Sequence, residues 1–315
     1  MSANDPLIFD RAAVRRHRER AATTFGEHSF LIDEVAERLA DRLDDVKRAF
    51  PLALDLGCHT GSFARVVGGR GGIETLVQAD LAPAMADAAR GARSTVAHRP
   101  AVAADEEFLP FADKTFDLIV SNMTLQWAND LPGALLQLNH ALQPDGLFLA
   151  AMPGGDTLCE LRHAVLMAES ELENGASPRV SPFPEMQDAT ALLQRAGFAL
   201  PVSDVDTITV SYPDALTLMN DLRRTGQSNA VRDRIRSWSR RETLVRAAEA
   251  YHDTYADDSG KIPVTVQVIT LTGWRPDASQ PLPLRPGEAH TRLAHALGTE
   301  EISAGVKAGP PTNGG

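Results

Sequence analysis

An acidic residue and two spaced glycines close the first clearly apolar run of the chain, in the stretch LDLGCHTGSF. Asp55, Gly57 and Gly61 stand where a buried strand would turn into a helix. In α/β sheets such turns lie at the carboxyl ends of the strands, where ligands bind. Because glycines let the backbone turn sharply and approach a ligand closely, the stretch indicates a small-molecule site.

Two residues inside this turn are unusual for such a site. His59 stands where the loop would usually carry a middle glycine, and Cys58 precedes it. Histidine accepts left-handed backbone angles better than most residues, so we expect the turn to form. Its imidazole would crowd the ligand or contact it, and we expect binding that is weakened but retained. Cys58 is expected to be a small packed residue rather than a nucleophile.

Two further carboxylates follow the next two predicted strands. Asp80 comes a little beyond the offset of roughly 20 residues at which an acid binds ribose hydroxyls in dinucleotide folds. It could equally cap the helix predicted from PAMADAAR. Asp105, in ADEEFLPF, could accept a hydrogen bond from an exocyclic amine or could be an ordinary loop acid.

The elements that must position these residues begin near residue 51, where apolar runs alternate with helical patterns. This alternation predicts an α/β fold with a mostly parallel sheet wound with helices. Two later runs, at 202–210 and 264–271, alternate polar and apolar residues for much of their length, which suits antiparallel strands at a sheet edge. The five earlier strand candidates are PLALDLG, ETLVQADL, STVAHRPAVAAD, TFDLIVSN and DGLFLAAMPGG.

The chain divides into three expected regions. Residues 1–50 would form a helical cap, in which Asp10 is a suitable N-cap for an arginine-rich helix. The arginines of this helix, at 11, 15, 16, 18 and 20, would form a solvated face or a partner-facing surface. Residues 51–275 would form the main domain, with its cofactor-binding half at 51–155 and substrate-side additions at 156–275. The composition of 276–315 is typical of a disordered tail.

The composition excludes several classes of protein. A net charge of −11 repels phosphate backbones, so we expect no nucleic-acid partner. The two cysteines lack a metal-binding spacing, so we expect no metal and a reducing compartment. No apolar run approaches the roughly 20 residues of a membrane span, and the opening MSANDPLIFD lacks the features of a secretion signal. We therefore expect a cytoplasmic protein.

Five motifs in this order resemble those of the class I S-adenosylmethionine-dependent methyltransferases. They are LDLGCHTG, VQADLAPAM, ADEEFLPF, FDLIVSNMTLQW and LQPDGLFLAAM, and they cover residues 52–152. A nicotinamide-binding loop would instead read G-x-G-x-x-G. The resemblance implies S-adenosyl-L-methionine as the cofactor. It also implies a Rossmann-like fold with a mostly parallel seven-stranded sheet, an antiparallel edge strand, N-terminal helices and C-terminal helical additions.

The same resemblance implies roles for individual residues. The loop from Gly57 to Gly61 would cradle the methionyl part of the cofactor, and Asn122 would lie beside the transferable methyl group. The implied cofactor contacts are Asp55, Gly57, Cys58, His59 and Gly61, then Asp80 and Leu81 at the ribose, Asp105 and Glu106 at the adenine, and Asn122.

Within this superfamily the chain resembles two groups. The SN…LQW pattern at 121–127 is similar to the malonyl-carrier-protein methyltransferases of biotin synthesis. Longer segments, among them IFDR, FPLALDLGC, GGDTLCELR and MNDLRRTGQSNA, are similar to the mitochondrial respiratory complex I assembly factor 5 family. This second resemblance runs over residues 9–274. It implies an arginine of a complex I subunit as the target, because members of that group are linked to arginine hydroxylation during assembly.

We therefore predict a methyltransferase-like enzyme that acts on a protein substrate. A guanidinium group binds carboxylates and stacks on rings, which makes Trp127, Asp156 and Glu160 the candidates to hold an arginine. Trp127 could equally pack in the core and Asp156 could cap a helix. We predict Asn122 and Trp127 as catalytic residues. The alternatives are a protein-arginine hydroxylase on the same fold, a malonyl-carrier-protein O-methyltransferase and a non-catalytic assembly chaperone.

Overall fold

The computed structural model describes residues 7–173, 175–281, 295 and 298–299. Most of the predicted tail, 276–315, lies outside these ranges, so its expected disorder stays a prediction. Residues up to Ala278 belong to one compact unit, and the elements below all lie in it. The division at residue 50 into a cap and a domain stays a prediction about roles. Within the described ranges, no helix combines the length and the apolar character that a bilayer crossing requires.

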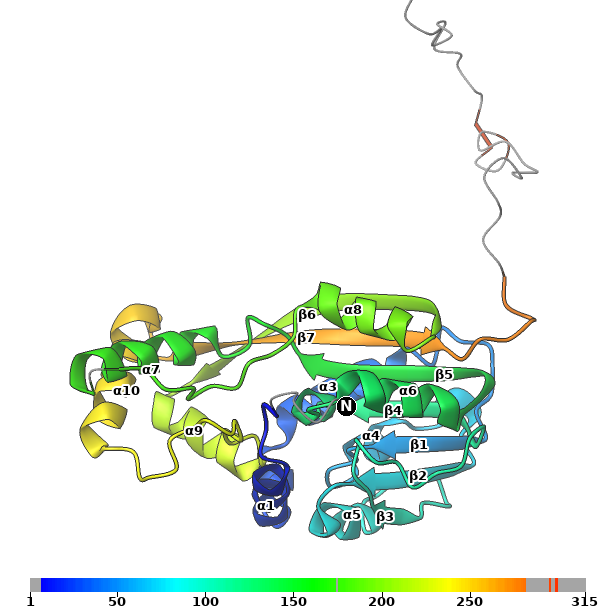
Figure 1. Ribbon diagram of the computed structural model, residues 1–315, viewed down its shortest axis with the longest axis horizontal. Helices are drawn as coiled ribbons and strands as arrows, with labels where there is room; N and C mark the ends of the chain where they lie inside the picture. The colour runs from blue at the N-terminus through cyan, green and yellow to red at the C-terminus, as the bar shows by residue number, and fades with distance from the viewer. Residues whose placement is uncertain (1–6, 174, 282–294, 296–297, 300–315) are drawn as a thin grey trace, which may run out of the picture. The chain divides into compact units, whose positions relative to one another are not determined.

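A seven-stranded sheet runs through this unit in the order β3-β2-β1-β4-β5-β7-β6 (Figure 1). The first five strands along the chain pair in parallel, whereas β7 pairs antiparallel with both β5 and β6. The predicted α/β class and the antiparallel pairing at this edge are confirmed. The strands are β1 Leu52–Leu56, β2 Thr75–Asp80, β3 Ala101–Ala103, β4 Phe116–Asn122, β5 Leu142–Pro153, β6 Ala199–Tyr212 and β7 Ile262–Trp274.

Ten α-helices and two short 3₁₀ turns are present in the described residues. Asp10 caps the first helix as predicted, because its carboxylate accepts a hydrogen bond of 3.0 Å from the amide of Ala13. The helices are α1 Arg11–Ala21, α2 Phe25–His28, α3 Phe30–Asp41, α4 Ser62–Val66, α5 Pro83–Arg90, α6 Leu131–Ala141, α7 Cys159–Leu172, α8 Met186–Arg195, α9 Ala215–Arg224 and α10 Arg241–Tyr255, and the turns are η1 Arg70–Gly72 and η2 Leu125–Trp127.

Helices cover both faces of the sheet. Alternate residues of β1 enter different cores, since side chains of a strand point to opposite faces in turn. Ala53 packs in the core that holds Leu39 of α3, and Leu54 packs in the core that holds Leu138 of α6. Figure 1 also places α7, α9 and α10 beside the parts of β6 and β7 that extend past the other strands. These additions extend the fold next to the carboxyl ends of the parallel strands.

Candidate functional site

The turn from β1 to α4 has the backbone that its glycines predict. Gly57 and Gly61 have φ angles of 74° and 85°, in the left-handed region. His59 also has a left-handed φ, of 50°, so the expectation that histidine would allow this turn is confirmed. The amides of Gly57 and Cys58 donate to the carbonyl of Ala79 at 2.7 and 3.0 Å, which ties the turn to β2.

The turn also packs closely on the end of β4. A Cβ atom on Gly57 would lie 2.2 Å from Cγ2 of Thr124, a distance at which something must shift. The missing side chain of Gly57 therefore admits Thr124, just beyond β4. Any larger residue at position 57 would separate the two carboxyl-end segments.

The imidazole of His59 is buried between these segments. Its Nε2 lies 2.9 Å from the carbonyl oxygen of Asn122, and because a carbonyl can only accept, Nε2 carries the proton. The ring stacks on Phe25, with centroids 5.1 Å apart. Burial lowers the pKa of His59, so the ring is neutral and its Nδ1 is an acceptor. Burial also raises the pKa of the Cys58 thiol well above its usual value, which agrees with a packed residue.

A buried ionic cluster lies next to the turn. Arg18 of α1 is 1% exposed, and its guanidinium donates to Glu106 at 2.8 Å, to Asp80 at 3.5 Å and to the hydroxyl of Thr124. Arg11 lies about two turns before Arg18 in α1, and it donates to Asp105 at 2.5 Å and also to Glu106. Burial alone would raise the pKa of Glu106, but the charges of the two arginines outweigh it and lower that pKa to about 2.

The predicted ribose and adenine carboxylates therefore lie together, but they already have partners. Besides Arg18, Asp80 accepts hydrogen bonds from the amides of Ala82 at 2.9 Å and His59 at 3.1 Å. The N-cap of α5 is Ala82, and no side chain caps this helix, so the alternative interpretation of Asp80 as a helix cap is wrong. Sequence reasoning missed Arg11 and Arg18 as ionic partners, although their spacing of seven puts both on one helical face.

Several buried polar atoms around the turn have no hydrogen-bond partner among the described residues. Both carboxylate oxygens of Asp55 are in this group, and so are both amide atoms of its register neighbour Gln78 on β2. The others are Nδ1 of His59, the hydroxyl of Thr60 and Oδ1 of Asn122. Buried polar groups are nearly always paired in folded proteins, so this group fits a polar ligand.

Asp55 is the most costly of these groups to bury. Burial first, and then the nearby charge of Asp80, raise the pKa of Asp55 to about 8, and Arg65 offsets this in part. The side chain is therefore largely protonated at neutral pH. A cationic group beside it would lower its pKa and stabilise the carboxylate.

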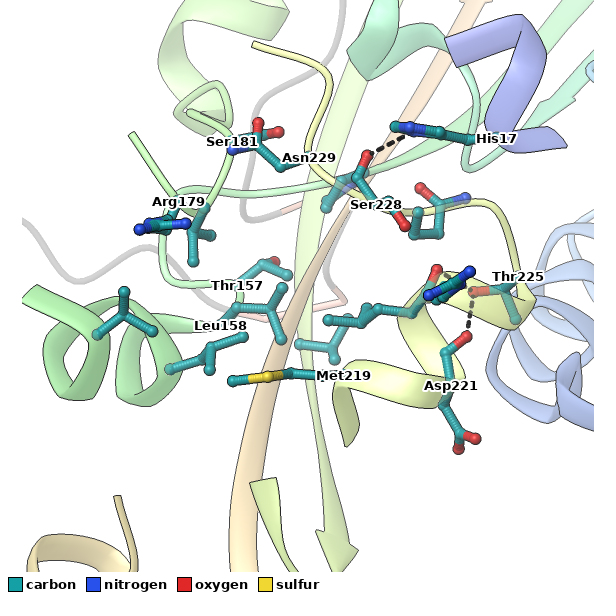
Figure 2. A pocket seen from close by; sticks show the side chains of 18 of the residues that line it. His17, Thr157, Leu158, Arg179, Ser181, Met219, Asp221, Thr225, Ser228 and Asn229 are labelled. Carbon is teal, nitrogen blue, oxygen red and sulfur yellow. Dashed lines mark hydrogen bonds between the residues drawn. The ribbon is translucent and has the colours of Figure 1, made fainter. Parts of the chain in front are cut away.

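A pocket of about 650 Å³ adjoins the site on the side of α7, α9 and α10 (Figure 2). Met123, Gln126 and Trp127, which follow β4, form its border toward the turn. The interior is largely apolar, and Figure 2 shows Leu158 and Met219 in it. None of the predicted cofactor residues lines this pocket, so the structure separates it from the turn.

Of the two predicted catalytic residues, one lines this pocket and the other does not. The amide nitrogen of Asn122 donates to the carbonyl of Ile32 at 2.9 Å, and Asn122 is not a lining residue of the pocket. Trp127 does line the pocket, although only 3% of it is exposed. Its ring meets Phe9 edge-on at 5.3 Å, and its Nε1 donates to Gln227 at 3.2 Å.

The two acids expected beside Trp127 lie elsewhere. Glu160 accepts from Thr265 on β7, and Asp156 accepts from the side chain of Gln267 at 3.1 Å. Neither lines the pocket, and the residue that caps α7 is Leu158 rather than Asp156. The structure therefore does not bring these two acids together with Trp127 around the pocket.

Comparison with protein-family models finds one domain in this chain. Residues 54–150 match the family described as a methyltransferase domain. The match begins in β1, includes the glycine turn and the ionic carboxylates, and ends in β5.

Curated relatives match most of the chain. The arginine-hydroxylase NDUFAF5 of Danio rerio is 39% identical over 289 residues, which are 91% of this chain and 88% of that protein. A malonyl-[acyl-carrier protein] O-methyltransferase of Methylovorus sp. is 37% identical over 285 residues, which are 89% of this chain and 94% of that protein.

Among solved structures, the YcgJ protein of Bacillus subtilis has a similar fold. Its TM-score is 0.52 at 16% sequence identity, over 76% of this chain and 98% of that one. The similarity concerns the arrangement of the strands and helices.

Proposed function

Because the chain belongs to the methyltransferase-fold family that includes the arginine hydroxylases NDUFAF5 and the malonyl-[acyl-carrier protein] O-methyltransferases, we propose that it binds S-adenosyl-L-methionine and modifies a protein substrate. The proposed target is an arginine of a respiratory complex I subunit. The observation that carries the cofactor proposal is the group of unpartnered polar atoms around the glycine turn. We keep the expected cytoplasmic location as a prediction.

The residues of the turn fit the cofactor in chemical type. The cofactor supplies an electrophilic methyl group on a sulfonium, and its methionyl part carries an ammonium group. Asp55 offers an unpaired carboxylate to this ammonium group. We propose that Gly57 to Gly61 hold the methionyl part, with Cys58 as a packed member of the turn. Asn122, at the end of β4, would face the reacting group.

The nucleotide part of the cofactor would meet the ionic cluster. We propose that Asp80 and Leu81 hold the ribose, and that Asp105 and the backbone of Glu106 hold the adenine. Asp80 is 0% exposed and a guanidinium nitrogen of Arg18 lies 3.5 Å from its Oδ1, so Arg18 must move before ribose hydroxyls can reach this carboxylate. We therefore propose that binding displaces α1, and that Arg18 competes with the ribose.

The substrate would approach through the pocket, where Trp127 forms part of the wall. Methyl transfer depends chiefly on holding a nucleophile in line with the methyl group, within about 3–3.5 Å. The role of Trp127 in this proposal is to position the substrate. A second candidate, the carrier methyltransferase, is favoured by the cationic rim of the pocket, where Arg20 and Arg223 would repel a guanidinium group. The arginine hydroxylase and the non-catalytic chaperone remain alternatives on the same fold.

Proteomic comparison tests the proposed activity. In a strain that lacks this gene, an arginine peptide of a complex I subunit should lose the mass of one CH2 group, the net gain on methylation, or of one oxygen atom, and complementation should restore it. Which mass is found separates methyl transfer from hydroxylation. If every subunit is unmodified in both strains, the chaperone alternative is favoured. If the gene relieves biotin auxotrophy, the carrier methyltransferase is favoured.

The variant His59→Gly tests the role of this histidine in the site. We expect it to bind S-adenosyl-L-methionine more tightly in isothermal titration, because the imidazole occupies space beside Asn122. The free energy of unfolding should fall by about 2–4 kcal/mol, since a buried ring is removed. Glycine recovers part of this loss at the left-handed φ of 50°.

Weaker binding by His59→Gly would mean that the imidazole contacts the cofactor. His98→Gly is the control for losing a histidine, because His98 is exposed and lies outside the turn. It should leave the affinity for the cofactor unchanged.

A further inference from the structure

Three arginines gather where the ends of α1 and α9 meet. Arg20 lies in the last turn of α1, and Arg223 and Arg224 lie in the last turn of α9. Together with Thr24 and Asn220 they line a hollow of about 340 Å³. All three arginines are exposed, and among the described residues none of the three takes part in an ion pair. We call these three residues the arginine cluster.

The positive charge at this place is not compensated within the described part of the fold. Burial, and then the charge of Arg223, lower the pKa of Arg20. Burial, and then the charge of Arg20, lower the pKa of the neighbouring His17 to about 4. The C-terminal end of a helix favours positive charge, which accounts for single arginines there but not for their convergence on one hollow. The chain as a whole is acidic, with a net charge of −11, so this convergence is local.

The hollow adjoins the apolar pocket, because Arg20 and Arg223 line both. Asp221 is the one acidic residue among the described residues around the pocket, and it is paired with His28 at 2.7 Å. Ile235 and Trp238 add apolar surface to the lining, and Trp238 is 98% exposed. An apolar interior with a cationic rim suits a ligand that has an apolar chain and an anionic head.

The hydrogen-bond donors that line the hollow indicate which anionic group the ligand would carry. One guanidinium can satisfy a carboxylate with two parallel hydrogen bonds. The arginine cluster offers three guanidinium groups from two helices, and Asn220 and Thr24 add an amide and a hydroxyl. Such donors around one hollow suit a phosphate group, which has more oxygens and a larger charge. We propose that the arginine cluster binds the phosphate of an amphiphilic phosphate ester, and that its apolar chain enters the pocket.

Calorimetric titration with octyl phosphate, kept below its micelle concentration, tests this site without any cofactor. Octyl phosphate should bind at least tenfold more tightly than inorganic phosphate or octyl glucoside, because only octyl phosphate has both parts. The double variant Arg223→Ala/Arg224→Ala should lose at least tenfold in affinity for octyl phosphate. Added salt should weaken binding to the wild type.

The matched control is Arg195→Ala. Arg195 is also an exposed arginine in the last turn of a helix, α8, and it lines neither the hollow nor the pocket. It should bind octyl phosphate like the wild type. Equal affinity of the wild type and the double variant would overturn the proposal, and so would equal binding of octyl phosphate and octyl glucoside. Unchanged thermal unfolding of the double variant confirms that a loss of affinity is local.

Vesicle sedimentation distinguishes two sources of such a ligand. Wild-type protein that sediments with phosphatidic acid vesicles, but not with phosphatidylcholine vesicles, would support the site with a membrane lipid as its ligand. Binding of monomeric octyl phosphate without sedimentation would support it with a soluble phosphate ester. Sedimentation that persists in the double variant would contradict the role of the arginine cluster.

Discussion

Replacing Arg18 by methionine is expected to lower the free energy of unfolding by about 3–5 kcal/mol and to tighten the binding of S-adenosyl-L-methionine. Removing one partner of a buried ion pair leaves the other charge uncompensated, which is strongly destabilising. In this variant Asp80 and Glu106 lose a guanidinium that is itself 1% exposed. The same loss frees Asp80 for the ribose. Urea denaturation and isothermal titration measure the two effects.

Two further variants make this result specific. Arg15→Met removes an exposed arginine of the same helix, whose contact with Glu19 spans 3.8 Å, and should change stability by less than about 0.5 kcal/mol. Asp80→Asn should weaken cofactor binding. If Arg18→Met bound the cofactor more weakly than the wild type, Arg18 would be a contact of the cofactor and not its competitor.

The dependence of stability on pH reports the same cluster. The folded-state pKa of Glu106, about 2, is below its ordinary value of 4.5. A depressed pKa stabilises the fold above the unfolded value, and this stabilisation is lost as the pH falls from about 4.5 to about 2. The wild type should therefore lose stability over this range. Arg18→Met should lose less, because one of the two charges that lower the pKa is gone.

Replacing Asp55 by asparagine is expected to raise the free energy of unfolding at pH 7 by about 4 kcal/mol and to weaken cofactor binding. The folded-state pKa of Asp55 is about 8, well above its ordinary value of 3.8. For an acid whose pKa is raised by folding, stability is highest below the unfolded pKa and falls as the pH rises toward the folded pKa. At roughly 1.4 kcal/mol per pH unit, the three units from 3.8 to 7 give this magnitude.

Denaturation at several pH values checks the assignment. Asp55→Asn and the wild type should have similar stability near pH 4, and the difference should grow up to pH 8 and then level off. Asp87→Asn is the control, since Asp87 is an exposed acid 65% accessible at its side chain. A variant Asp55→Asn that is less stable than the wild type at pH 7 would contradict the burial of an unpaired carboxyl group.

Cofactor binding should also release a proton from Asp55. A cation beside the carboxyl group lowers its pKa, so the protonated group of the free protein ionises on binding at pH 7. Titrations in buffers of different ionisation enthalpy should reveal this proton for the wild type and not for Asp55→Asn. If Asp55→Asn is more stable than the wild type but binds the cofactor more weakly, the protein keeps Asp55 for its function at a cost in stability.

Local patterns predicted the parts of the fold that depend on neighbouring residues. The glycine turn and the cap at Asp10 were foreseen because each depends on backbone conformation within a few residues. The segment STVAHRPAVAAD was predicted as a strand, but β3 comprises only Ala101–Ala103, and His98 forms an isolated bridge to Thr75 of β2. Pro100 cannot donate to a ladder, and β3 is an edge strand with one neighbour.

The features of the site that sequence patterns did not predict depend on contacts between distant segments. Arg18 and Glu106 are 88 positions apart, and no local rule joins an arginine-rich helix to a loop after β3. In the same way Glu160 meets Thr265 across 105 positions, so its carboxylate is held by β7 instead of facing the pocket. Composition predicted an acidic protein but could not place the arginine cluster, which exists only because α1 and α9 meet.

The position of β7 has a consequence for how the chain is completed during synthesis. This strand, Ile262–Trp274, is the last strand among the described residues, yet it lies between β5 and β6. Until it emerges from the ribosome, β5 has a free edge and β6 has no strand to pair with. Free edges invite pairing with other chains. A stop codon shortly before residue 262 should therefore yield an aggregating product, even though every residue proposed to hold the cofactor would be present.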